Sequence, residues 1–224
     1  GRTYMLDGHM RHEDHMGNVG ELTEGGVQWM SAGRGVIHSE MPQQEEGRMR
    51  GFQLWINLPS AEKMTPAQYR DIPAGEIPEV SVPGGSVKVI AGAVVTGNGT
   101  VPGPINGLTT EPVFLDVALE EGATFEQPLP ATHNIFVYPY EGELETGDDA
   151  AATPLAGQAA GVLGKGDHVR VRATGGPARF VLLAGKPLNE PVVQHGPFVM
   201  NTREEIDQAL RDYRDGVLAH PVLS

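Results

Sequence analysis

The sequence contains no cysteine among its 224 residues. A disulfide framework, a thiolate metal site and a cysteine nucleophile are therefore excluded. No apolar run approaches the roughly 18 residues that a membrane-spanning helix needs, and no basic segment followed by an apolar one opens the chain. We expect a cytoplasmic protein with no membrane partner, in which any metal is bound by histidine and carboxylate side chains.

Clusters of basic residues are also missing. The chain has 16 lysines and arginines against 29 aspartates and glutamates, which gives a formal net charge of −13. A protein that binds nucleic acid usually carries a concentrated basic surface, so we expect no direct nucleic-acid partner. The acidic balance is typical of a charge that keeps a protein in solution.

Glycine and proline are abundant, with 30 and 18 copies, and they interrupt short apolar runs. This pattern predicts many turns and short strands. Three segments with the alternation of half-buried strands fall between residues 27 and 58, and a barrel or a sandwich closes such sheets most simply. The predicted strands span residues 27–30, 36–40, 52–58, 87–90, 113–117, 134–138, 168–171 and 179–183.

Two domains of similar fold are expected. The polar segment 59–82 is interpreted as a connector, which places a boundary near residue 75 and gives domains 1–75 and 76–224. A weak internal repeat relates residues 4–10 to residues 138–144.

One helix is predicted near the end of the chain. It begins at Thr202, which with Glu205 forms a capping box, and Ile206, Ala209, Leu210 and Tyr213 follow at helical spacing. We expect this helix to pack against a barrel, and residues 216–224 to form a frayed tail.

His38 and Glu40 are the sharpest local signal of chemistry. They lie two residues apart in an extended segment, so both side chains point to the same face of one strand. An imidazole and a carboxylate on one face form part of a facial site for non-haem Fe(II), which leaves coordination positions open for substrate or dioxygen. The alternative interpretation is a solvent-facing pair on an amphipathic strand.

His9, His12 and His15 form a second cluster, and their spacing of three matches neither a strand nor a helical zinc motif. A polar hairpin turn is one interpretation. The other makes His12 a third metal ligand or a group at the rim of the site. In the second domain the repeat places Arg179 and Val181 where His38 and Glu40 lie in the first, so we expect that domain to be metal-free.

The sequence resembles the pirin family along its whole length. The matching segments are Leu6-Asp7-Gly8, residues 12–18, Val27 to Pro42, Gln53 to Pro59 and Glu190 to Asn201. The resemblance implies an all-β bicupin, two tandem cupin barrels with a C-terminal helix. It implies one mononuclear metal, usually iron, held by three histidines and one glutamate in the N-terminal barrel.

His38 and Glu40 match the last two of those four ligands. The other two come from a His-Pro-His element that would precede Tyr4 together with the opening strands of the barrel, and this sequence starts after it. The first barrel is therefore expected to lack its N-terminal strands. An incomplete chain explains this better than a natural short variant with a lost or rebuilt site.

The resemblance implies an enzyme similar to quercetin 2,3-dioxygenase, in which Fe(II) binds a flavonol and dioxygen. Glu40 would then be a catalytic residue that accepts the proton of the flavonol hydroxyl, while His38 holds the iron and Trp29 or Met30 shapes the barrel. Two alternatives remain. One is a non-catalytic, metal-dependent regulator with a transcription factor or metabolic enzyme as its protein partner, and the other is a metal-free truncated homologue.

Overall fold

The computed structural model describes residues 2–43, 46–147, 152–155, 161–163 and 167–219. This part of the chain is mostly β-strand with one α-helix near its end, which confirms the predicted fold class. Within the described residues, no helix is long and apolar enough to cross a membrane.

The chain divides into two compact units. Unit 1 contains residues Gly1–Ala74 together with Leu188–Ser224, and unit 2 contains Gly75–Pro187. The C-terminal helix thus belongs to unit 1, whereas the sequence analysis placed it in the second domain. The domain ranges 1–75 and 76–224 stay a prediction.

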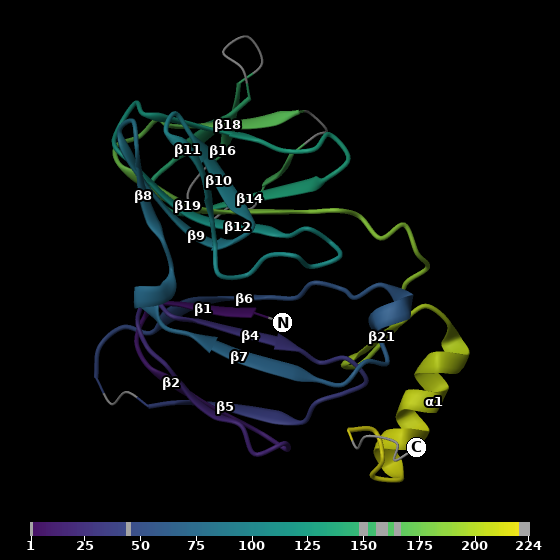
Figure 1. The fold of residues 1–224 in the computed structure, drawn as a ribbon. Helices are drawn as coiled ribbons and strands as arrows, with labels where there is room; N and C mark the ends of the chain where they lie inside the picture. Colours follow the sequence, from purple (N-terminus) through teal and green to yellow (C-terminus); the bar gives the residue numbers. More distant parts are fainter. Residues whose placement is uncertain (1, 44–45, 148–151, 156–160, 164–166, 220–224) are drawn as a thin grey trace. The chain divides into compact units, whose positions relative to one another are not determined.

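Unit 1 is built from two sheets and a hairpin (Figure 1). The first sheet has the strand order β6-β1-β4-β7 and the second has the order β3-β2-β5, with every pairing antiparallel. The strands are β1 (Arg2–Asp7), β2 (Met10–Asp14), β3 (Val19–Leu22), β4 (Val27–Ser31), β5 (His38–Pro42), β6 (Arg50–Leu54), β7 (Gln68–Ile72), β20 (Val193–His195) and β21 (Phe198–Met200).

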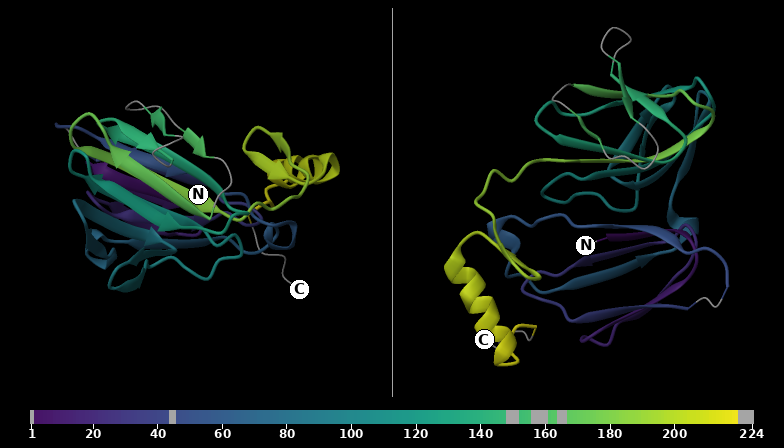
Figure 2. Two further views of the ribbon diagram at one scale, coloured as in Figure 1. Left: turned by 90° about the horizontal axis from the view of Figure 1, so that it is seen from above. Right: turned by 180° about the vertical axis from the view of Figure 1, so that it is seen from behind.

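The helix α1 (Arg203–Arg214) lies beside the β20–β21 hairpin (Figure 2). Thr202 caps it as predicted, because its hydroxyl oxygen accepts a hydrogen bond from the backbone N–H of Glu205 at 3.2 Å. Ile206 and Ala209 are buried against the hairpin residues Val193, Phe198 and Met200. Leu210 and Tyr213 lie in the helix as their spacing predicted, but both side chains are exposed.

Unit 2 contains a six-stranded sheet, β17-β14-β19-β12-β9-β8, a four-stranded sheet, β13-β18-β15-β16, and the β10–β11 hairpin. Their bounds are β8 (Glu79–Val82), β9 (Gly85–Ala91), β10 (Ala93–Thr96), β11 (Gly99–Pro102), β12 (Val113–Leu119), β13 (Thr124–Pro128), β14 (Asn134–Glu141), β15 (Leu144–Thr146), β16 (Thr153–Leu155), β17 (Gly161–Leu163), β18 (His168–Ala173) and β19 (Ala178–Gly185).

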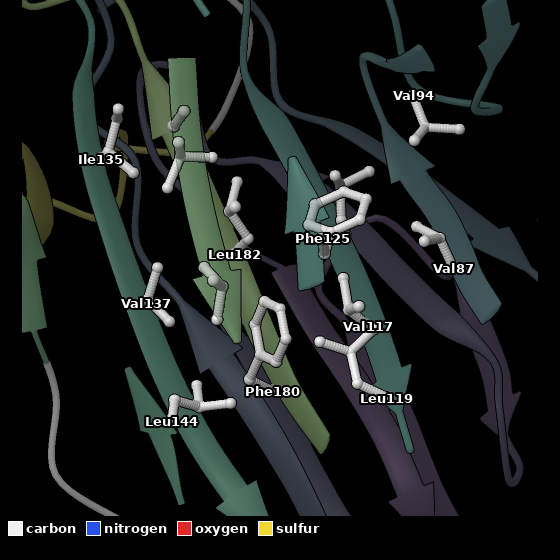
Figure 3. Packing of buried hydrophobic residues seen from close by; sticks show 14 of the residues in the cluster. Val87, Val94, Val117, Leu119, Phe125, Ile135, Val137, Leu144, Phe180 and Leu182 are labelled. Carbon is white, nitrogen blue, oxygen red and sulfur yellow. The ribbon is translucent and has the colours of Figure 1, made fainter. Parts of the chain in front are cut away.

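The core of unit 2 is apolar. Alternate residues of its strands point inward, as a half-buried strand requires, so Leu115 and Val117 of β12 meet Phe180 and Leu182 of β19. Phe125 packs on Phe180 with the ring centroids 6.4 Å apart (Figure 3). Full burial of one such side chain stabilises the fold by about 1.5–3 kcal/mol.

The structure corrects three details of the predicted strands. Val36 and Ile37 precede β5 instead of opening it, and residues 55–58 lie outside β6. The segment 59–82 is not a plain connector, because it contributes β7 to the first sheet of unit 1 and β8 to unit 2. Of two short 3-10 turns in this segment, η1 (Ser60–Glu62) precedes β7 and η2 (Ala74–Glu76) lies between β7 and β8.

Candidate metal centre

The site begins with the pairing of β2 and β5. In their register His12 lies opposite Glu40, and Asp14 lies opposite His38. Residues directly opposite each other, and residues two apart on one strand, point to the same face of a sheet. The four side chains therefore share one face, so the predicted common face of His38 and Glu40 holds in the structure.

That face is directed at the other sheet of unit 1. Gln53 of β6 donates a hydrogen bond through Nε2 to Oε2 of Glu40 at 3.3 Å. The ring of His12 stacks on Tyr69 of β7, with centroids 4.9 Å apart and planes 9° from parallel. Side chains of both sheets thus meet between the two layers of unit 1 that are visible in Figure 1, where His12 is buried and Gln53 is exposed.

Two imidazoles in this interior have buried nitrogen atoms without hydrogen-bond partners. They are Nδ1 and Nε2 of His12, which is 1% exposed, and Nδ1 of His38. The two rings lie 5.3 Å apart between centroids. Burial lowers the pKa of His12, and the neighbouring His38 lowers it further, so His12 is neutral near pH 7.

The alternation of β7 supplies two polar residues that the sequence analysis missed. Tyr69 and Asp71 lie opposite Met30 and Gln28 of β4, which places these four residues on the inward face of the first sheet. Burial and a hydrogen bond with Asp71 raise the pKa of Tyr69 well above its usual value. Residues 68–72 read Gln-Tyr-Arg-Asp-Ile, which has no polar–apolar alternation that would have revealed this strand.

The interior is closely packed beside these groups. A Cβ atom at Gly20 of β3 would lie 1.9 Å from the Tyr69 hydroxyl oxygen and 2.0 Å from Oδ2 of Asp71. Glycine is therefore the residue that admits both side chains. Met30 is 7% exposed and lies on this inward face, whereas its neighbour Trp29 points to the opposite face of the sheet.

The donor chemistry fits a metal ion, since a ring nitrogen of His38 lacks a partner and a carboxylate lies on the same strand face. The number of donors is smaller than a complete site needs. Among the residues that the structure describes, no group of three or more His, Cys, Asp or Glu side chains is arranged to hold a metal.

The other histidine cluster of the sequence is a hairpin turn only in part, since His15 lies in the turn between β2 and β3. His12 lies inside β2 and is buried, His9 precedes that strand and pairs with Glu21, and His15 follows it. In unit 2, Nη2 of Arg179 in β19 lies 3.8 Å from Oδ2 of the buried Asp116, and Val181 is buried. The absence of a metal from unit 2 stays a prediction.

Comparison with known proteins identifies relatives over almost the whole chain. Residues 2–56 match the family model described as Pirin, and residues 114–219 match the Pirin C-terminal cupin domain. A Pseudomonas aeruginosa protein with the name putative quercetin 2,3-dioxygenase is 51% identical over 218 residues, which are 97% of this chain and 76% of that protein. Human pirin is 44% identical over 216 residues, covering 95% and 72% of the two chains.

A solved structure supports the same relationship. The crystal structure of quercetin 2,3-dioxygenase from Acinetobacter baumannii aligns with a TM-score of 0.88 and 33% identity, over 97% of this chain and 75% of that one. Sequence and fold agree along both units. The chain therefore belongs to the pirin family, whose architecture is two cupin domains in tandem.

Proposed function

We propose that this chain is a metal-binding bicupin that acts as an iron-dependent dioxygenase on a flavonol such as quercetin, with His38 and Glu40 as metal ligands. One observation carries the proposal: both side chains are half-buried on one strand face that is directed at the other sheet of unit 1. The names of the Pseudomonas and Acinetobacter relatives supply the reaction class.

A mononuclear Fe(II), when bound, supplies open coordination positions where an anionic oxygen of the substrate and dioxygen can meet. His38 would hold the ion through its imidazole. Glu40 would hold it through its carboxylate and accept the proton of the flavonol hydroxyl, so that the substrate binds as an anion. Gln53 donates to one carboxylate oxygen of Glu40 and thereby fixes the orientation of that group.

The first test is the metal content of the purified chain by elemental analysis, beside His38→Ala. We expect near-stoichiometric iron that is lost in the variant, because the imidazole nitrogen is a ligand. His168→Ala, which removes an exposed histidine of unit 2, is the matched control and should keep the metal. A wild-type chain without metal would show that this chain is not the enzyme.

Turnover of a flavonol tests the role of Glu40. The Glu40→Gln variant keeps the shape of the side chain but cannot accept the proton, so we expect turnover to fall by about 10²-fold or more. Unchanged turnover in this variant would remove Glu40 from the mechanism. A chain that binds iron and turns over no flavonol would support the regulator in place of the enzyme.

A further inference from the structure

His15 closes the β2–β5 pairing at the end where β5 begins. Its backbone N–H donates to the carbonyl of Ile37 at 2.9 Å. In return the backbone N–H of Ile37 donates to Nδ1 of the His15 ring at 3.1 Å. In a regular antiparallel ladder the Ile37 N–H would donate to the backbone carbonyl of the opposite residue, and here it donates to the ring nitrogen instead. Ile37 directly precedes His38.

The same ring reaches the C-terminal segment. Nε2 of His15 lies 3.2 Å from the carbonyl oxygen of Ala219. Because Nδ1 accepts a hydrogen bond from Ile37, it carries no proton, and Nε2–H is the donor to Ala219. One neutral tautomer satisfies both contacts.

The segment that His15 contacts is itself anchored to α1. The backbone N–H of Leu218 donates to the carbonyl of Asp212 at 3.1 Å, and its side chain packs on the cluster around Ile206. Leu218 also lies against Gly35, where a Cβ atom would come within 2.9 Å of its Cγ. The residues after α1 therefore contact the turn after β2 through His15 and the loop before β5 through Gly35.

We propose that His15 is a positioning residue for the metal site, which links the segment after α1 to the backbone at the start of β5. The proposal rests on the proposed function insofar as His38 is a metal ligand. The ring of His15 holds the Ile37 amide, and Ala219 holds the ring in the tautomer that can do so. The direction of the His38 side chain follows from the backbone that these contacts fix.

Three substitutions separate the two contacts of the ring. Asn at position 15 can place an oxygen near the position of Nδ1 and keep the acceptor for Ile37. Gln can place a donor near the position of Nε2 and keep the contact with Ala219. Ala removes both. If His15 contributed only to the overall stability of the chain, the His15→Asn and His15→Gln variants would behave alike.

The decisive measurement is amide hydrogen exchange of Ile37 in the metal-free chain. We expect exchange to be about three- to tenfold faster in His15→Ala and His15→Gln, and to return near the wild-type rate in His15→Asn. Equal exchange rates in all four proteins would overturn the proposal. So would a failure of Asn to restore protection that Ala has removed.

The iron dissociation constant, measured by competition with a chelator, extends the test to the metal. We expect weaker binding by about three- to tenfold in His15→Ala and recovery in His15→Asn, since a misplaced ligand costs affinity. His9→Ala is the matched control, because His9 precedes the same strand but contacts Glu21 instead of β5. An equal loss in His9→Ala would overturn the specific role of His15.

The two proposals fail in different ways. If the wild-type chain binds no iron, the proposed function is wrong, and the exchange of Ile37 still decides whether His15 positions β5. If iron binds with the same affinity in all His15 variants, the positioning role is wrong and the metal site stands.

Discussion

Tyr140 and Asp116 show how one residue pair can link the stability of unit 2 to pH. The Tyr140 hydroxyl donates to Oδ1 of Asp116 at 2.5 Å, and both side chains are buried. Burial raises the pKa of Tyr140 well above its usual value of 10.0, and the charge of Asp116 raises it further. The guanidinium of Arg179 lies 5.1 Å above the tyrosine ring and opposes part of this shift.

We expect the unfolding free energy to fall as the pH rises above about 10, because the unfolded tyrosine then loses its proton while the folded one keeps it. Below that pH the contribution is fully present. In Tyr140→Phe the fall should be shallower, and at neutral pH the variant should be less stable by about 1–3 kcal/mol, since a partner of Asp116 is lost. Urea unfolding at several pH values measures both effects.

Tyr69 also has a raised pKa, and it is present in both the wild type and Tyr140→Phe. The difference between the two proteins in the slope of unfolding free energy against pH therefore isolates Tyr140. Parallel pH profiles for the wild type and Tyr140→Phe would contradict the assignment.

At this scale the sequence predicted part of the candidate site. The shared strand face of His38 and Glu40 could be predicted because residues two apart in a strand point to the same side, while their role as metal ligands stays a prediction. Tyr69 and Asp71 were missed because their strand lies in a polar segment with prolines nearby, and their place beside His12 depends on the pairing of β7 with β4. The burial of His12 could not be predicted from the sequence either, because it results from contacts between two sheets.

At the scale of elements, the loop between β4 and β5 is held against the backbone that precedes β7. Gly33 has a φ of +50°, and the next residue, Arg34, donates its backbone N–H to the carbonyl of Thr65 at 2.9 Å. A Cβ atom at Gly33 would lie 2.0 Å from that carbonyl oxygen, which is a backbone atom and cannot rotate away. The loop therefore requires glycine for both its conformation and its close approach.

We expect Gly33→Ala to destabilise the chain by about 1–3 kcal/mol through overpacking, in addition to the cost of the positive φ. Gly17→Ala is the control, because Gly17 also has a positive φ, of +83°, but no atom lies within 4 Å of the added Cβ. Urea unfolding should show the larger loss in Gly33→Ala. Equal losses would mean that the contact with Thr65 carries no cost.

Strand existence was easier to predict than strand boundaries. The apolar runs in β9, β12, β14 and β19 predicted their strands because those strands form an apolar core. The segment 55–58 was predicted as strand on composition, yet the pairing of β6 with β1 ends at Leu54. The helix start at Thr202 was predictable because the capping signal is local, whereas the exposed faces of Leu210 and Tyr213 depend on what α1 packs against.

At the scale of the whole molecule, the two units can be observed separately. The chain contains two tryptophans, Trp29 and Trp55, and both belong to unit 1. Tryptophan fluorescence therefore reports on unit 1, while far-ultraviolet circular dichroism reports on the strands of both units. A chain with two compact units need not unfold in one step.

Phe180→Ala removes a side chain that is 0% exposed in the core of unit 2. We expect a loss of about 3–5 kcal/mol in that unit, because a cavity remains where the ring packed. The circular dichroism midpoint in urea should fall by more than the fluorescence midpoint. Coincident shifts of the two curves would show that both units unfold as one cooperative block.

The two interiors place different demands on future sequence change. Between the sheets of unit 2, apolar side chains are interchangeable as long as their total volume is kept, so this half of the gene can drift while its protein keeps folding. Between the sheets of unit 1, each of His12, Tyr69 and Asp71 faces a specific polar or aromatic neighbour, and Gly20 leaves no volume to spare. Unit 1 is therefore expected to tolerate fewer substitutions than unit 2.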